Sequence, residues 1–136
     1  EHPSTLTSMG NLAGILKALG DLKEAKKLQV KEYEICSRIL GEEHPSTLTS
    51  MANLAVIYLE DNSPADAMSL ALKAWQGSQL AYGAVHNATI QALVLCMVIV
   101  QQLEDKSAAE KVQGQIAEFF AEFPEALNLL KELMSQ

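Results

Sequence analysis

The chain has 136 residues, of which 49% are hydrophobic and 5% aromatic, and its 17 acidic and 10 basic side chains give a net charge of -7. An acidic chain with few aromatic residues lacks the positive surface and the stacking platforms of nucleic-acid-binding proteins, so we do not expect a nucleic acid partner. Leucine (20) and alanine (18) are frequent, whereas glycine and proline total 11. This composition is typical of packed helices and predicts an all-α fold.

The chain offers no membrane-spanning segment. Its longest apolar run, Ala92 to Val100, has nine residues, against the roughly 20 that a helix needs to cross a bilayer. We therefore expect no membrane partner. Two cysteines sixty positions apart, Cys36 and Cys96, in a chain without an export signal predict free thiols in a reducing compartment and a cytoplasmic location.

An internal repeat with a period of 42 residues organises the chain. Residues 1–9 are identical to residues 43–51, and the tripeptide Asn-Leu-Ala at 11–13 recurs at 53–55. A third, diverged copy begins near His86. A period between about 20 and 50 residues is typical of a solenoid, in which each unit buries its apolar face against the next unit.

Each unit is expected to contain two helices separated by turn residues. In the first unit, the second helix is predicted at Leu22 to Leu40, with Asp21 as N-cap and Gly41 as C-cap. Pro45 suits the first position of the next helix, and Ser63 is a candidate N-cap for the helix that follows.

The third unit has two unusual features. Its first helix, predicted at Ala88 to Leu103, is apolar on all sides, so it requires cover from the rest of the chain, a ligand or a second chain. The three phenylalanines gather just before Pro124, and a short helix then restarts. Four apolar residues of that helix are predicted to share a face and to cap the solenoid: Leu127, Leu130, Leu133 and Met134.

The second unit, with His-Pro-Ser-Thr-Leu-Thr-Ser-Met-Ala-Asn-Leu-Ala-Val-Ile-Tyr at 44–58, resembles the 42-residue tetratricopeptide repeat (TPR) of kinesin light chains. Similar repeats occur in nephrocystin-type proteins and in NB-ARC signalling proteins of fungi and bacteria. The resemblance implies an α-solenoid of three TPR helix-turn-helix repeats, at residues 1–42, 43–84 and 85–123, with a capping helix at 124–135. We expect one domain that forms the C-terminal part of a longer array.

The resemblance also implies which residues form the core. Small side chains at the second-helix crossing position correspond to Ala25, Ala67 and Ala109. The first-helix core positions correspond to Leu12, Ala13 and Leu16 in the first unit and to Leu54, Ala55 and Tyr58 in the second. Glu32 and Met97 stand where small residues are usual. The third unit is therefore expected to pack less regularly.

A catalytic or metal site is not expected. The chain has no glycine-rich phosphate loop. Its three histidines recur at a fixed period before helices, which places them in successive units too far apart to share a metal ion, so we interpret them as helix-entry residues. Glu42 and Glu43 are expected to be solvated. We predict no enzyme activity, no cofactor and no bound metal.

Protein binding is the function that remains. In arrays that this chain resembles, the first helices line a concave groove, and the asparagine of the Asn-Leu-Ala motif holds an extended peptide. The groove residues implied here are Asn11, Lys17, Thr49, Asn53, Val56, Gln91 and Val98. The net charge is 0 over residues 1–42, -3 over 43–84 and -4 over 85–136, which favours basic ligands. The alternative is a spacer or oligomerisation module of a larger signalling protein, with homo-oligomers formed through the apolar third repeat.

Overall fold

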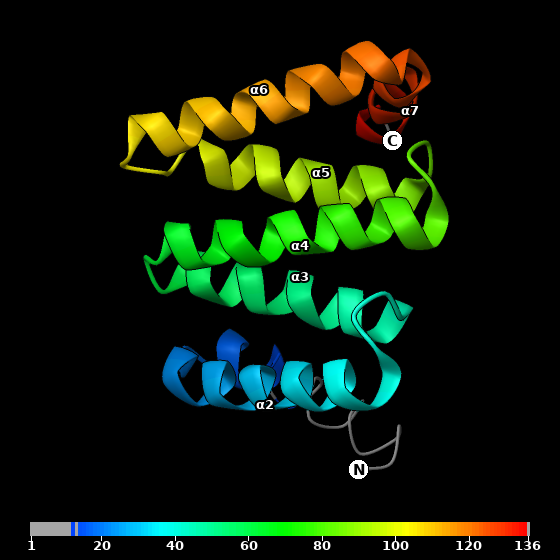
Figure 1. Cartoon of the computed structure of the whole chain (residues 1–136). Coiled ribbons are helices and arrows are strands. Elements are labelled where there is room, and N and C mark those ends of the chain that lie inside the picture. The colour runs from blue at the N-terminus through cyan, green and yellow to red at the C-terminus, as the bar shows by residue number, and fades with distance from the viewer. Residues whose placement is uncertain (1–11, 13, 136) are drawn as a thin grey trace.

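The fold is an all-α solenoid (Figure 1). The computed structural model describes residue 12 and residues 14–135, which contain helices and no strand. After helical residues 14–18, the helices are α2 (Leu22–Leu40), α3 (Pro45–Glu60), α4 (Pro64–Tyr82), α5 (Asn87–Val100), α6 (Lys106–Glu122) and α7 (Pro124–Met134). The bounds predicted for the second helix are confirmed.

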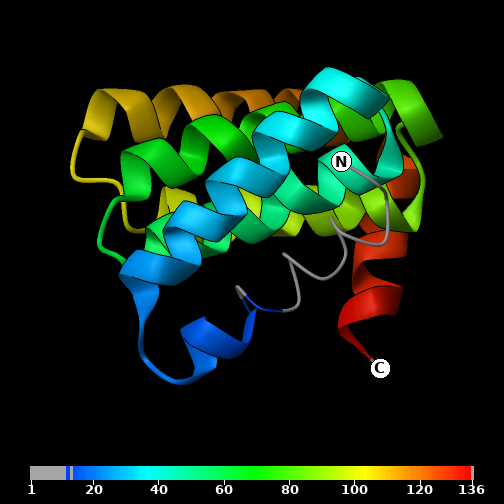
Figure 2. The same cartoon turned by 90° about the horizontal axis from the view of Figure 1, so that it is seen from below.

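The helices lie in two layers (Figure 2). Helices α2, α4 and α6 form one layer, which we call the second-helix face, and residues 14–18, α3 and α5 form the other, the first-helix face. The period of 42 persists in the structure, because α2, α4 and α6 begin at residues 22, 64 and 106, and α3 and α5 begin at 45 and 87.

Capping residues explain where the helices begin and end. The backbone N–H of Glu24 donates to Asp21 Oδ1 at 3.2 Å, as predicted for an N-cap. His44 and His86 cap α3 and α5, since Nδ1 of each accepts from a backbone N–H two residues later at 3.1 and 3.0 Å. This confirms their interpretation as helix-entry residues. Ser63 stands at the N-cap position of α4, but its side chain makes no capping hydrogen bond.

The main core runs continuously from α3 to α7. Ala25 and Ala67 are 0% exposed and Ala74 is 1% exposed, which confirms that small side chains occupy the close helix crossings of the first two units. Leu54 and Ala55 are buried as predicted, and Tyr58 is half-buried against the core. The core therefore depends on alanine contacts that let helix backbones approach.

Some residues of the first unit lie outside the expected core. Leu12 is 47% exposed and Leu16 is half-buried, while Ala13 lies outside the described residues. Ile39, near the C-terminal end of α2, is 45% exposed.

The third unit is less regular, as its departures from the repeat predict. Helices α5 and α6 contact each other over a shorter stretch than α3 and α4 do, and they diverge toward α7 (Figure 1). Met97 and Ile116 stand one period after Ala55 and Ala74, so bulky side chains replace two small ones between the helices. Ala109 is consequently only half-buried, unlike Ala67.

Helix α5 ends at Val100, three residues before the predicted end at Leu103. The turns of the first two units use positive φ angles at Gly20 (87°) and Asn62 (58°). The equivalent residue of the third unit is Glu104, which tolerates that conformation less readily than glycine or asparagine. The chain therefore leaves the helix earlier and reaches α6 through a different turn.

Helix α7 covers the end of the solenoid and packs against both α5 and α6. Figure 2 shows its C-terminal end extending past the first-helix face. The predicted contact face is partly wrong, because Leu127 and Met134 are exposed. The packed residues are Ala126, Leu129, Leu130 and Leu133, since α7 crosses α5 and α6 at an angle that sequence spacing does not determine. Seven of the 14 residues of α5 are buried by the chain itself.

Candidate functional site

A shallow hollow on the first-helix face brings together three of the predicted groove residues. Lys17, Asn53 and Val56 line it together with Gly14, Gln29 and Ile57, and its volume is about 180 Å³. Gly14 stands one period before Val56, and a methyl group added at Gly14 would meet nothing within 4 Å. The first unit thus has no side chain, and open space, at the position where the second unit has a valine.

Asn53 supplies the polar group of this hollow. Its side chain is exposed and, among the residues that the structure describes, has no hydrogen-bond partner. An amide offers both a donor and an acceptor, which is the combination that a peptide unit requires. Asn53 is therefore free to bind a backbone laid across α3.

Lys17 lies in the hollow but is not an isolated cation. Its Nζ atom is 3.2 Å from Glu60 Oε1, and both side chains are partly exposed. Exposed ion pairs contribute little to stability, so a ligand carboxylate could compete for Lys17. The pairing nevertheless removes net positive charge from the hollow.

The remaining predicted groove residues do not line this hollow. Thr49 and Gln91 are exposed on α3 and α5, and Val98 is 46% exposed on α5. Gln91 and Val98 lie one unit farther along the same face, whereas Thr49 lies one turn before Asn53 on α3. Asn11 lies outside the described residues.

A buried polar cluster beneath the hollow was not anticipated from the sequence. Gln29 Nε2 donates to Ser50 Oγ at 3.1 Å and to Glu32 Oε1 at 3.3 Å, and it joins α2 to α3. One period later these positions are Ala71, Ala74 and Ala92. Comparing the two units position by position would have revealed the exchange of alanine for polar residues.

The Glu32 carboxyl is costly to ionise in this cluster. It is 8% exposed, its Oε2 atom has no hydrogen-bond partner, and burial raises its pKa above the ordinary 4.5, although Ser50 and Gln29 oppose the effect. The folded protein therefore holds this proton more tightly than the unfolded chain does. The resulting stability is fully present below pH 4.5 and is lost as the pH rises through the raised pKa.

We expect Glu32→Gln to raise the melting temperature at pH 7. Glutamine keeps the hydrogen bond with Gln29 but cannot ionise, so it avoids the cost of a buried carboxylate. Thermal unfolding should be followed by circular dichroism from about pH 4 to pH 8. The advantage of the variant should grow with pH. An advantage independent of pH would contradict the role of ionisation, and the exposed Glu34→Gln change is the control.

The described residues contain little that suggests catalysis. They include no group of three or more histidine, cysteine, aspartate or glutamate side chains placed to hold a metal ion. Cys36 and Cys96 are free and buried, and burial raises the pKa of Cys96 to about 12, so its thiol is held protonated at neutral pH. No helix within residues 12 and 14–135 combines the length and the apolar character needed to cross a membrane.

Known proteins share this architecture. Two crystal structures of a Podosopora anserina protein of kinesin-light-chain type with nearly identical TPR-like repeats, one of them of a variant with a single substitution, superpose with a TM-score of 0.71. They have 24% and 25% sequence identity and cover 91% and 94% of this chain. BtubC (BKLC) from P. vanneervenii superposes with a TM-score of 0.60 at 14% identity over 93% of the chain. The chain matches 58%, 63% and 61% of these structures, less than two thirds of each.

The sequence itself also identifies the family. The Tetratricopeptide repeat profile matches residues 4–79, more than half of the chain. No curated protein matches the sequence. The profile match, the period of 42 residues and the two-layered helical architecture agree, and the chain therefore belongs to the tetratricopeptide repeat family, with repeats of the kinesin-light-chain type.

Proposed function

We propose that the chain is a non-catalytic protein-interaction module that binds an extended peptide along the first-helix face. The observation that carries the proposal is the hollow in which Asn53, Val56 and Lys17 meet. Asn53 would bind the peptide backbone, Val56 would contact an apolar side chain, and Lys17 would attract a carboxylate. Thr49, Gln91 and Val98 would extend the contact along α3 and α5, and Asn11 would continue it into the first unit.

The proposal includes the organisation of the chain. Residues 1–42, 43–84 and 85–123 would be three repeats and 124–135 the cap of one domain. This domain would work in the cytoplasm, where Cys36 and Cys96 stay reduced. Because the second and third repeats carry the negative charge, basic peptides would be favoured at that end of the face.

We expect Asn53→Ala combined with Val56→Asp to weaken peptide binding at least tenfold. The double variant removes the amide and places a charge in the apolar part of the hollow. Peptides selected from a random library displayed on phage would be synthesised and measured by fluorescence anisotropy. The matched control is Asn128→Ala with Ala121→Asp, at exposed positions of α7 and α6. Equal affinity for the parent chain and the Asn53 and Val56 variant would reject the proposed groove.

Self-association is the second candidate, and one observation favours it. Val98 is 46% exposed on α5 beside half-buried Val94 and Leu95, so an apolar strip remains after the chain has folded. A dimer formed through this strip should dissociate on Val98→Lys substitution. Sedimentation velocity over a concentration series measures this, and a monomer at all concentrations would exclude the candidate.

A further inference from the structure

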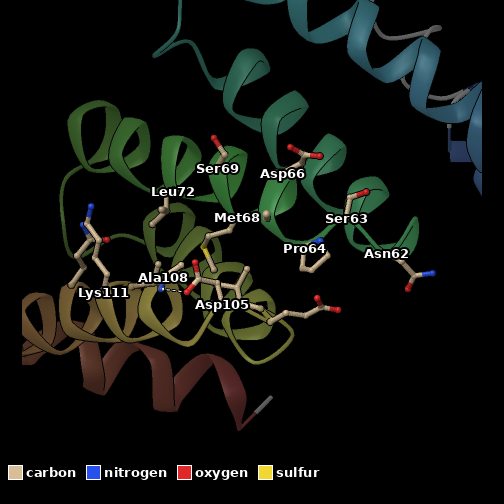
Figure 3. Close-up of a pocket in the computed structure, with 15 residues that line it drawn as sticks. Asn62, Ser63, Pro64, Asp66, Met68, Ser69, Leu72, Asp105, Ala108 and Lys111 are labelled. Atoms are coloured by element: carbon tan, nitrogen blue, oxygen red, sulfur yellow. Dashed lines mark hydrogen bonds between the residues drawn. The ribbon is translucent and has the colours of Figure 1, made fainter.

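A large hollow lies on the second-helix face, opposite the proposed peptide groove. It has a volume of about 710 Å³ and lies between the N-terminal halves of α4 and α6. Figure 3 shows Met68 and Leu72 projecting from α4 toward α6. Half-buried Leu72 and Leu103 form its apolar floor, with the buried Met68 and Val112, 4% and 5% exposed, beneath them. Its volume lies within the range of sites that bind small molecules or peptide side chains.

A smaller hollow one repeat earlier has related lining residues. Its volume is about 260 Å³. Val30, Ser69 and Leu70 line it, and the residues 42 positions later, Leu72, Lys111 and Val112, line the larger hollow. The two hollows are therefore successive copies of one feature of the repeat, and the differences between them can be assigned to particular residues.

The Tyr58 ring lines the first copy, and an ion pair lies next to that ring. Lys26 Nζ is 2.9 Å from Asp61 Oδ2 and lies 5.7 Å from the centroid of the Tyr58 ring. The hydrogen bond to Asp61 raises the pKa of Lys26. Polar side chains thus cover the surface between α2 and α4.

The second copy has lost all three of these groups. One period after Lys26, Asp61 and Tyr58 stand Met68, Leu103 and Val100. The ion pair has become two apolar side chains, and valine lacks the ring that fills space in the first copy. The exchange explains why the second hollow is both larger and more apolar.

Negative charge surrounds this apolar floor. Asp66, Glu104 and Asp105 line the hollow together with the ammonium of Lys111. Asp105 accepts from the backbone N–H groups of Ser107 and Ala108 at the start of α6. Among the residues that the structure describes, neither Asp66 nor Glu104 has a cation within ion-pair distance, although the Asp66 charge contributes to the raised pKa of Lys26. An apolar floor with unpaired carboxylates at its edge is complementary to an apolar segment that carries positive charge.

We propose that this hollow is a second binding site, specific for a peptide segment of a partner protein with aliphatic side chains flanked by lysine or arginine. The aliphatic side chains lie against Met68, Leu72 and Leu103, and the basic side chains lie beside Asp66 and Glu104. The chain then holds two peptides on opposite faces of one solenoid. The site is independent of the groove formed by α3 and α5.

Two synthetic peptides test the proposal on the full 136-residue chain. Both carry fluorescein and two central leucines. Lysines flank the leucines in one, and glutamates flank them in the other.

The methionine methyl groups of the protein are labelled with ¹³C, and Met68→Leu assigns the Met68 signal. We expect the lysine peptide to shift the signal of Met68, which lines the hollow, and to leave that of Met51, which does not line it, unchanged. The glutamate peptide should have no effect.

Two sets of variants separate the apolar and the charged contributions. Met68→Lys with Leu103→Asp rebuilds the ion pair of the first copy and should weaken binding of the lysine peptide at least tenfold by anisotropy. Asp66→Lys with Glu104→Lys alters only exposed side chains, so it should leave the fold intact and reverse the preference between the peptides. Circular dichroism melts verify that each variant is folded.

The outcomes distinguish this site from the groove. Asn53→Ala with Val56→Asp should bind the lysine peptide as the parent chain does, even if the groove proposal fails. A shift at Met97 or Met134 without one at Met68, equal binding of both peptides, or no binding at about 1 mM peptide would each overturn the proposal.

Discussion

Replacing Phe119 with alanine is expected to lower the free energy of unfolding by about 3–5 kcal/mol. Phe119 is 6% exposed, and its ring centroid lies 5.3 Å from that of Trp75 on α4 and 5.3 Å from that of Phe123. The substitution removes a buried ring and leaves a cavity where α4, α6 and the start of α7 meet. Trp75 also loses an edge-to-face partner.

Chemical denaturation followed by circular dichroism measures this loss. Phe120→Ala is the matched control, because Phe120 is half-buried and its ring centroid is 5.7 Å from that of Phe119. We expect Phe120→Ala to lower the free energy of unfolding by clearly less than Phe119→Ala does. Equal losses for the two variants would show that Phe119 is not the centre of the aromatic cluster.

Ala67→Leu is expected to destabilise the fold by about 1–3 kcal/mol through overpacking. Ala67 is 0% exposed where α3 and α4 cross, so a larger side chain must push the helices apart or adopt a strained rotamer. Thermal and chemical unfolding should both detect the loss. A neutral result would mean that the close crossing does not depend on a small residue.

Ala109→Leu provides the comparison one repeat later. Ala109 is half-buried, and α5 and α6 contact each other over a shorter stretch than α3 and α4 do. The added atoms therefore meet fewer neighbours, and we expect a smaller loss of stability than at Ala67. The opposite order would contradict the looser packing of the third unit.

Sequence reasoning succeeded where the signal was local or repeated. Asp21 and Gly41 mark the start and the end of α2 as predicted, because a cap acts within one turn of its own helix. Ala25 and Ala67 are buried because the repeat places the same small residue at the same helix crossing. Of the groove residues, the hollow brings together Lys17, Asn53 and Val56, and their role in binding stays a prediction.

Predictions failed where a contact depended on how two helices cross. Helical spacing placed Leu127 and Met134 on the packed face of α7, but its angle to α5 and α6 exposes them. The ion pair of Lys17 with Glu60 joins two units, and local spacing contains no information about it. The hollow beside Met68 likewise requires α4 and α6 to be placed next to each other.

The amino-acid sequence by itself determined the repeat, the helix boundaries set by caps and the family, because these depend on residues close in the chain or on identity between units. The tertiary structure decided which faces are covered, that Gln29, Glu32 and Ser50 form one buried cluster, and that one face carries a shallow polar hollow and the other a larger apolar one. These features arise between helices of different units. Their geometry follows from the packing of whole side chains against one another, which periodicity along a single helix does not specify.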